Sequence, residues 1–453
     1  MPGVAAGVNG AADLAVVGAG PAGALLALLA ARRGLRVALL ERRADPRTAT
    51  PEAGRSINLA LAARGLQALD AAGVLPALQP LLVPMPGRQL HLADGSETFS
   101  PYGQLPGETN HSISRVDLAR CLIEAAAADP RIALRFRCRA LGLADDGAVM
   151  LQDEDTGLRS ELPAARVIGA DGAGSALRKA LAQAGHVEAS NELLEHEYKE
   201  LNIPPLDGSC ALAVREALHI WPRRGFMLIA LPNTDHSFTA TLFLPRAGAV
   251  SFASLASPAA ARAFFAREFP DALRLMPHFE HEFATHRQGV LGTVRCAPWN
   301  LGERLLLIGD AAHAIVPFHG QGMNCALEDC VLLDGLLADG LPAPFARFSA
   351  ARRADTEAIA AMSLENYAEM RAAVLEPRFR RQQGLALQLE RRHPGRFIPR
   401  YSMVMFHAEI PYSVARERGR IQQQLLDELT ASGAPVDLAL ADQLVMQRLP
   451  ALA

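Results

Sequence analysis

The stretch DLAVVGAGPAG, residues 13–23, decides the fold of this chain. An apolar strand over Leu14–Val17 runs directly into a glycine-rich turn, and a helix is expected over residues 24–33. A second apolar strand over residues 36–40 then ends at Glu41. The order strand, glycines, helix, strand and acid is typical of a βαβ unit that binds a dinucleotide, and we predict such a unit here.

Each glycine of the turn has a physical task. One makes the tight turn, one lets the backbone approach a pyrophosphate, and one lets the helix pack closely on the strand, so Gly18, Gly20 and Gly23 are assigned to the ligand loop. The helix N-terminus adds free N–H groups and a partial positive charge. Glu41, 18 residues after Gly23, can accept hydrogen bonds from an adenosine ribose. These residues alone leave FAD and NAD(P) as alternatives.

The composition indicates a large globular protein. The 453 residues exceed the ~250–300 at which one core usually splits, so two or three subdomains are expected. The net charge of −3 argues against a nucleic-acid-binding surface. The apolar runs are all shorter than the ~18–20 uncharged residues of a membrane span, so we expect a soluble protein without one.

The cysteine spacing argues against a metal site. None of the six cysteines forms a CxxC pair, so neither a zinc site nor a disulfide framework is indicated. We therefore expect reduced thiols, a cytoplasmic location and no metal.

Two later segments favour FAD over NAD(P). Residues 167–178 (VIGADGAGSALR) place Asp171 after a strand in a D-G-x-x-S-x-x-R pattern, and residues 305–313 (LLLIGDAAH) end another strand at Asp310. Three strand-end sites fit one extended ligand, and a carboxylate at Asp310 can hold a polyol hydroxyl such as one of the flavin ribitol. A helix after Gly320–Gly322 would aim its N-terminus at the flavin ring and stabilise its reduced, negatively charged form.

Five further segments carry a family resemblance: GRSINLALAARG (54–65), PYG (101–103), LIGDAAHAIVPFHGQGMNCALEDC (307–330), ENYAEMR (365–371) and YSMVMF (401–406). With the three strand-end motifs they make the chain resemble the class A flavoprotein aromatic hydroxylases, and more closely the kynurenine 3-monooxygenase family. The resemblance covers about residues 13–410.

The resemblance implies an α/β fold with a Rossmann-like FAD-binding domain, a β-sheet substrate domain and a helical C-terminal region. It implies bound FAD and NADPH as a transient co-substrate, in agreement with the single GxGxxG unit in the sequence. The implied reaction is hydroxylation of L-kynurenine at C3 of its ring with O2, through a flavin C4a-hydroperoxide, to give 3-hydroxy-L-kynurenine. Another aromatic amine or a phenol as substrate is the alternative.

Arg88 and Tyr102 are the first substrate-binding candidates, because a guanidinium can grip a carboxylate with two hydrogen bonds and a phenol can add another. The resemblance places them at the family's carboxylate-binding pair. Asn366 and Glu369 share a helix face at i, i+3, and the resemblance places them, with Tyr401, at the amino-acid end of the substrate. It also puts Glu369 among the catalytic residues. A surface arginine, a core tyrosine and a solvated helix face are the alternatives.

The loop at residues 317–322 is expected over the flavin. Pro317 and Phe318 would wall the substrate pocket, and His319 would polarise or position the ring carbonyl or amine of the substrate as a catalytic residue. The alternative for His319 is a hydrogen-bonded loop histidine.

The cofactor-binding residues come from the motifs and from the resemblance together. For Arg115, the alternative is an arginine that only begins a helix. The full predicted set is Gly18, Gly20, Ala22, Gly23, Glu41, Arg42, Arg43, Ala60, Arg115, Ala140, Asp171, Asp310, Gly322, Met323 and Asn324.

The cofactor-binding segments predict a discontinuous FAD-binding domain over residues 1–85, 111–195 and 291–350. Residues 86–110 and 196–290 are expected to form a substrate-binding sheet domain, and residues 351–453 a helical cap over the active site. The expected partners are a small aromatic amino acid and O2, with the chain a monomer or homodimer.

Three other functions share the first motif. A flavin-dependent halogenase needs a lysine-bearing tunnel and a WxWxIP motif, but Trp221 stands alone and neither Lys179 nor Lys199 is suitably placed. An FAD reductase acting on lipids is harder to exclude from the FAD motifs alone. An FAD-sensing binding protein would have no use for the substrate residues or the 317–322 loop.

Overall fold

The computed structural model describes residues 12–48, 58–338, 340, 342–371, 376–432 and 435–452. Residues 1–11 of the predicted first domain and residues 54–57 of the GRSINLALAARG segment lie outside these ranges.

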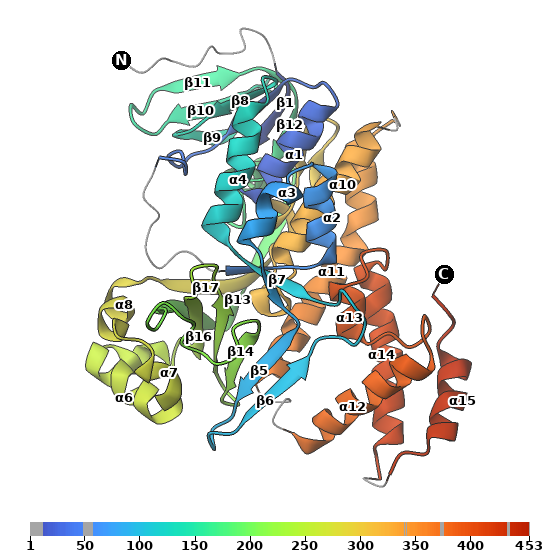
Figure 1. Ribbon diagram of the computed structural model, residues 1–453. Coiled ribbons are helices and arrows are strands. Elements are labelled where there is room, and N and C mark those ends of the chain that lie inside the picture. The colour runs from blue at the N-terminus through green and yellow to red at the C-terminus, as the bar shows by residue number, and fades with distance from the viewer. Residues whose placement is uncertain are drawn as a thin grey trace.

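A six-stranded sheet forms the first layer of the molecule, at the top of Figure 1. In spatial order its strands are β18 (Asn300–Leu301), β19 (Leu305–Leu307), β12 (Ala164–Gly169), β1 (Ala12–Val17), β2 (Val37–Leu40) and β8 (Ile132–Arg135). The pairs from β19 to β8 are parallel, and β18 runs antiparallel to β19. β2 and β19 are buried along their whole length, as expected of parallel strands covered on both faces.

Helices pack around this sheet and against one another. α1 contacts both α4 and α10, and α10 also contacts α2 (Figure 1). The helices of this half are α1 (Pro21–Arg32), α2 (Ala63–Ala71), α3 (Leu75–Leu78), α4 (Arg115–Ala128), α5 (Ala176–Gln183), α9 (Asp310–His313) and α10 (Gly322–Ala338).

The turn between β1 and α1 requires glycine at two places. Gly18 has a φ of +100°, and a Cβ on it would lie 2.4 Å from the carbonyl oxygen of Ala170 at the end of β12. A Cβ on Gly23 would lie 1.9 Å from the Gly18 carbonyl oxygen. The predicted close approach of helix and strand is therefore present, and Pro21 begins the helix at a position that needs no N–H donor.

A seven-stranded sheet forms the second layer. In spatial order it comprises β17 (Gln288–Ala297), β13 (Glu188–Ile203), β16 (Phe238–Pro245), β15 (Met227–Pro232), β14 (Leu218–Pro222), β5 (Gly87–His91) and β6 (Glu97–Pro101). One face packs on α6 (Pro258–Glu268), α7 (Pro270–Arg274) and α8 (Phe279–Thr285) in an apolar core that includes Trp221. Other side chains of the sheet, among them Ile220 and Phe243, form a second apolar cluster with Phe318 and Tyr367.

Two three-stranded sheets complete the β structure. One has the order β3 (Asn58–Leu61), β7 (Asn110–Ser114), β4 (Val83–Met85), and the other the order β11 (Arg159–Leu162), β10 (Val149–Asp153), β9 (Cys138–Leu143).

The C-terminal part is helical, as predicted, and lies at the lower right of Figure 1. Its longest helix, α11, has 28 residues. The helices are α11 (Pro344–Arg371), α12 (Pro377–Arg392), α13 (Arg400–Met405), α14 (Tyr412–Leu429) and α15 (Leu438–Arg448). Within the described ranges, no helix is both long and apolar enough to cross a membrane.

Four of the predicted domain boundaries fall inside elements. The boundary at 110/111 lies within β7 (Asn110–Ser114), those at 195/196 and 290/291 lie within β13 and β17, and the boundary at 350/351 lies within α11. β13 and β17 pair from Glu188 to Lys199, so the predicted FAD-binding segments also contribute residues to the seven-stranded sheet. A strand that continues through a boundary leaves no turn signal in the sequence.

We predict that Gly23→Ala destabilises the protein strongly, because its Cβ would overlap a backbone carbonyl oxygen that cannot move aside. The expected loss is ~3 kcal/mol or more of unfolding free energy, at the upper end of overpacking costs. Gly20→Ala is the matched control, since no atom lies within 4 Å of its Cβ position. Its expected loss is below ~1 kcal/mol. Thermal unfolding of the two variants measures the difference, and equal losses would contradict the prediction.

Candidate active site

The three strand-end motifs meet at one edge of the six-stranded sheet. β19, β12 and β1 are neighbouring parallel strands, so their carboxyl ends lie side by side. The glycine loop follows β1, Asp171 follows β12, and Asp310 follows β19. Open α/β sheets bind ligands at such an edge. The structure therefore brings together the motifs that were predicted to hold one extended ligand.

Glu41 joins the glycine loop to the end of β2. Its Oε2 accepts a hydrogen bond from the Ala19 N–H at 3.0 Å, and its Oε1 accepts one from the Arg43 N–H at 2.9 Å. Both carboxylate oxygens thus fix the backbone around the predicted ribose position. The side chains of Arg42 and Arg43 are exposed beside it.

Two other predicted cofactor residues lie on neighbouring elements. Ala140 is buried on β9, and the beginning of this strand binds the Glu41 region through the Cys138 N–H, which donates to the Glu41 carbonyl at 2.9 Å. Arg115 is exposed at the first position of α4, after the capping residue Ser114.

The Asp171 carboxylate caps α5. Its Oδ2 accepts hydrogen bonds from the N–H groups of Ala176 (2.7 Å) and Leu177 (3.3 Å). Its Oδ1 is buried and has no hydrogen-bond partner among the described residues. Asp310 is exposed at the start of α9. A buried orphan oxygen and an exposed carboxylate at the same sheet edge suit a ligand that carries hydroxyl groups.

Asn324 fixes the loop before α10 to β3. Its Oδ1 accepts from the Ala62 N–H at 2.9 Å, and its Nδ2 donates to the carbonyls of Ala60 and Gly320, both at 2.8 Å. The side chain of Asn324 is therefore occupied in holding the backbone of predicted cofactor-binding segments. Gly320 has a φ of +68°, which favours glycine in this turn.

The N-terminal end of α1 packs against the middle of α10, whose own N-terminal end follows the loop at residues 317–321. The half-buried Ala22 in the first turn of α1 accepts a weak hydrogen bond from the Cys330 thiol of α10 at 3.2 Å. Gly322 opens α10, and the half-buried Met323 follows it. Two helix N-termini, a glycine cradle and unsatisfied carboxylate oxygens fit a flavin dinucleotide, whose pyrophosphate and ring need donors and whose ribitol needs acceptors.

The predicted carboxylate clamp lies on the seven-stranded sheet. Arg88, on β5, is buried, and its guanidinium carbon lies 5.1 Å from the ring centre of Tyr102 and 4.6 Å from that of Tyr401. The two tyrosine rings stack at 5.1 Å, and the ring of His319 stacks on Tyr401 at 5.3 Å. Tyr102, Tyr401 and His319 thus form one continuous stack of three polar rings, and the buried Arg88 guanidinium lies against two of them.

His319 is neutral at physiological pH in this group. Burial, together with the positive charges of Arg400 and Arg88, lowers the pKa of His319 to about 3. Its Nδ1 is buried without a hydrogen-bond partner among the described residues. Burial also raises the pKa of Tyr102, so its phenol keeps its proton and can donate. The site therefore offers a fixed cation, a protonated phenol and a neutral imidazole.

Asn366 and Phe318 position the His319 loop. The Asn366 Nδ2 donates to the Phe318 carbonyl at 2.6 Å, and the Phe318 ring stacks on Tyr367 with a centroid distance of 3.8 Å. Pro317, which was expected to wall the pocket beside Phe318, is exposed. It occupies the first position of the short 3₁₀ turn Pro317–His319, directly before the buried Phe318 and His319, so its place on the pocket wall stays a prediction.

Glu369 lies half-buried near the clamp. Its Oε2 is 3.8 Å from the guanidinium of Arg400, and its charge helps to keep Arg88 protonated. The i, i+3 spacing predicted that Glu369 shares a face of α11 with Asn366. The contact of Glu369 with Arg400, which belongs to α13, was not predicted.

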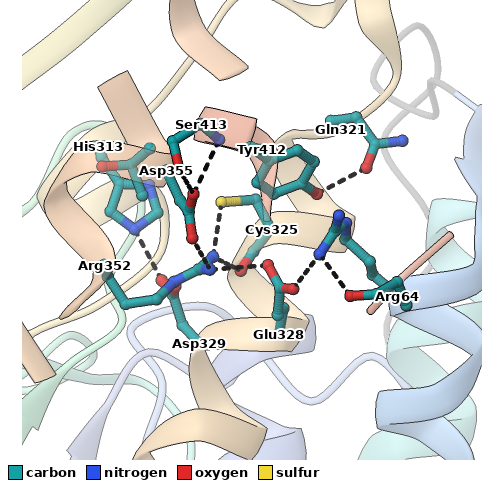
Figure 2. A network of polar contacts seen from close by, with 12 residues as sticks. Arg64, His313, Gln321, Cys325, Glu328, Asp329, Arg352, Asp355, Tyr412 and Ser413 are labelled. Carbon is teal, nitrogen blue, oxygen red and sulfur yellow. Dashed lines mark hydrogen bonds and ion pairs between the residues drawn. The ribbon is translucent and has the colours of Figure 1, made fainter. Parts of the chain in front are cut away.

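A buried carboxylate, Asp329 on α10, joins the cofactor edge to the C-terminal helices (Figure 2). Its Oδ2 accepts from the Gly309 N–H at 2.9 Å and bonds the His313 Nε2 at 2.7 Å, and its Oδ1 accepts from the Arg352 Nε at 2.7 Å. Burial raises the pKa of Asp329, but His313, Arg352 and the Gly309 N–H outweigh it and hold the pKa below its ordinary value. Asp329 is therefore a stable anion.

The network continues from Arg352 through Glu328 to α2. The Arg352 Nη1 lies 2.8 Å from the Glu328 Oε2, and the Glu328 Oε1 binds Arg64. Arg352 Nη2 also donates to the Cys325 Sγ at 3.1 Å. His313, Cys325 and Asp329 have the ligand types of a metal site, but the Arg352 guanidinium supplies the positive charge among them.

The same network reaches α14. The Tyr412 hydroxyl donates to the Gln321 Oε1 at 2.8 Å, so the loop before α10 is tied to the C-terminal helices. Ser413 donates to the Asp355 carboxylate through its N–H (2.9 Å) and its hydroxyl (2.7 Å).

Similarity to known proteins also indicates an FAD-binding site in this chain. The FAD binding domain family matches residues 11–344. A kynurenine 3-monooxygenase of Xanthomonas euvesicatoria pv. vesicatoria is 46% identical over 97% of this chain and 98% of its own length. One of Myxococcus xanthus is 44% identical over 96% of this chain and 95% of its own.

The chain belongs to the kynurenine 3-monooxygenase family. The prediction of this family, of its α/β FAD-binding fold and of FAD as the cofactor is confirmed.

Solved structures of other oxygenases share the fold of this chain. A tetrameric 2-methyl-3-hydroxypyridine-5-carboxylic acid oxygenase superposes with a TM-score of 0.65 at 20% identity and covers 81% of this chain, with 94% of its own length matched. The p-nitrophenol 4-monooxygenase PnpA from Pseudomonas putida DLL-E4 gives a TM-score of 0.66 at 17% identity, over 91% of this chain and 98% of its own.

Several residues of the site were not predicted. Asn110 donates to the Tyr401 hydroxyl, Tyr367 supports Phe318, and Arg400 pairs with Glu369. A lone asparagine, tyrosine or arginine has no local pattern that marks such a contact. Asp329 did carry a signal, since an acid within an apolar helix needs a buried partner.

We predict that Arg352→Met destabilises the protein by ~3–5 kcal/mol, because it removes the buried guanidinium that pairs with both Asp329 and Glu328. Arg353→Met is the matched control, since the Arg353 side chain is exposed and its ion pair within the described ranges is with Glu357, at 3.2 Å. Its expected loss is ~0–1 kcal/mol. Urea denaturation of both variants measures the difference, and a small loss for Arg352→Met would show that the network does not stabilise the fold.

Proposed function

We propose that this protein is an NADPH-dependent FAD monooxygenase that hydroxylates L-kynurenine at C3 of its aromatic ring to give 3-hydroxy-L-kynurenine. The observation that carries the proposal is the buried Arg88 beneath Tyr102 and Tyr401, next to the loop expected over the flavin. Relatives of the same length and 44–46% identity carry that activity in their names.

The substrate has three polar parts that match the site: a carboxylate, an α-ammonium group, and an aromatic amine beside a ring carbonyl. In the proposal, Arg88 binds the carboxylate, because a buried guanidinium attracts an anion strongly and offers it two parallel N–H donors. Tyr102 and Tyr401 add hydroxyl groups from the two stacked rings.

When bound, FAD supplies the redox chemistry: it would accept electrons from NADPH, activate O2 and provide the electrophilic oxygen atom. The chain itself orients the substrate and excludes water. His319 is neutral at pH 7, so it positions the ring carbonyl or amine through a hydrogen bond and adds no positive charge to the electron-rich ring. Asn366 holds the Phe318 carbonyl and hence the loop that carries His319.

Glu369 is proposed to set the charge of the site. It lies 3.8 Å from the Arg400 guanidinium and interacts electrostatically with Arg88, so it compensates positive charge when the substrate carboxylate is absent. Phe318, stacked on Tyr367, forms an apolar wall for the substrate ring.

We also propose a cytoplasmic location and a monomer or homodimer. The first is supported by six free cysteines, which are typical of a reducing compartment.

Purified protein tests the proposal directly. NADPH oxidation is measured with and without L-kynurenine while 3-hydroxykynurenine is followed by mass. We expect strong stimulation by L-kynurenine and a hydroxylated product. Oxidation that is indifferent to L-kynurenine would contradict the proposal, and stimulation by another aromatic amine or a phenol alone would favour the alternative substrate.

We predict that Arg88→Ala raises the Kd for L-kynurenine severely while FAD stays bound. Removing one partner of a buried charge pair costs ~2–5 kcal/mol, which is at least ~30-fold in Kd. Arg88→Lys is the control that keeps the charge but loses the paired donors, so its Kd should lie between the two. Perturbation of the flavin spectrum on titration with L-kynurenine gives the Kd. Loss of FAD from Arg88→Ala would mean that Arg88 supports the cofactor instead.

A further inference from the structure

Asn110 is a buried polar residue in contact with the substrate clamp. It is the first residue of β7 and pairs with Met85 of β4. Its side chain is only 1% exposed. The loop that precedes it carries Tyr102, so Asn110 and Tyr102 approach the clamp from the two ends of one short segment.

The two ends of the Asn110 amide differ in their partners. Its Nδ2 donates to the hydroxyl oxygen of Tyr401 at 3.2 Å. Its Oδ1 is buried and has no hydrogen-bond partner among the described residues. A buried amide oxygen without a donor is unfavourable, so this side of the clamp is one hydrogen bond short.

The Nδ2 contact also directs the hydroxyl of Tyr401. A phenol has one hydrogen to donate. Because Asn110 donates to the Tyr401 oxygen, the Tyr401 hydrogen is left for another acceptor, and the guanidinium of Arg88 lies 4.6 Å from the centre of the same ring. A carboxylate bound at Arg88 is an acceptor in that position.

Two of the other polar groups nearby are already engaged, whereas the His319 Nδ1 also lacks a partner among the described residues. The Asn366 amide donates to the Phe318 carbonyl, and Glu369 faces Arg400 and Arg88. The Oδ1 of Asn110 is therefore a free, uncharged acceptor next to Tyr401 of the clamp, available to a donor beside the carboxylate. In an α-amino acid that donor is the ammonium group, one carbon away from the carboxylate.

We propose that Asn110 binds the α-ammonium group of the substrate through its Oδ1 and makes the site selective for α-amino acids over the corresponding deaminated carboxylic acids. This inference rests on the proposed function, which supplies an α-amino acid as the ligand. It assigns the carboxylate to Arg88 and the tyrosines, and the ammonium to Asn110.

The test compares two ligands on the FAD-bound enzyme: L-kynurenine and its deaminated analogue, 4-(2-aminophenyl)-4-oxobutanoic acid. Perturbation of the flavin spectrum gives the Kd of each. The wild-type enzyme should prefer L-kynurenine, and Asn110→Leu should reduce that preference roughly 10- to 100-fold, because a hydrogen bond to a charged group is lost. A mere supporting role for Asn110, through Tyr401, would weaken both ligands equally and would overturn the proposal.

Two further variants keep the test decisive. Asn110→Asp retains the shape and an acceptor, so it should keep or increase the preference for L-kynurenine, while its charge weakens the binding of the deaminated acid. A lower preference in Asn110→Asp would contradict the assignment even if Asn110→Leu folds poorly. Tyr401→Phe is the comparator that should weaken both ligands to a similar degree.

The outcome also separates this inference from the proposed function. Wild-type enzyme that hydroxylates L-kynurenine but shows equal losses for both ligands in Asn110→Leu would overturn the role of Asn110 alone. Wild-type enzyme that neither binds nor hydroxylates L-kynurenine would overturn both.

Discussion

The buried ion pair between Asp329 and Arg352 is the interaction on which the two halves of the site depend. The carboxylate of Asp329 holds the Gly309 N–H, and thereby the turn that presents Asp310 at the end of β19. Its cation, Arg352, belongs to α11, the helix that carries Asn366 and Glu369. A buried charge is tolerated only with such partners. If the cofactor edge and α11 moved apart, one of the two charges would become exposed to solvent or would be left buried without its partner.

The site as a whole is assembled from segments that have little in common locally. The clamp takes Arg88 from the strand next to the edge of the seven-stranded sheet, Tyr102 from a loop, Tyr401 from a short C-terminal helix and His319 from the loop before α10. Because each ring is packed against the next, their positions are fixed before any ligand arrives. Such pre-organisation reduces the entropy that a bound substrate must lose.

The sequence predicted what local patterns encode. The β1–α1 glycine turn and the strand ends at Asp171 and Asp310 follow from the order of apolar and glycine residues. The resemblance placed Arg88, Tyr102 and Tyr401, which the fold brings together. The resemblance did not reveal that the side chains of Glu41 and Asn324 form hydrogen bonds with the protein's own backbone. Asn110, Arg400 and the Asp329 network were missed because each depends on a partner at least 20 residues away in the chain.

The length of α11 has an evolutionary consequence. Arg352 and Asn366 are 14 residues apart, about 21 Å and just under four turns of an α-helix, so they project from nearly the same side. Inserting or deleting a single residue between them would rotate one relative to the other by about 100° and would break either the ion pair or the contact with the Phe318 carbonyl. Substitutions along the exposed side of this stretch leave both contacts in place, whereas the insertion or deletion of a single residue breaks one of them.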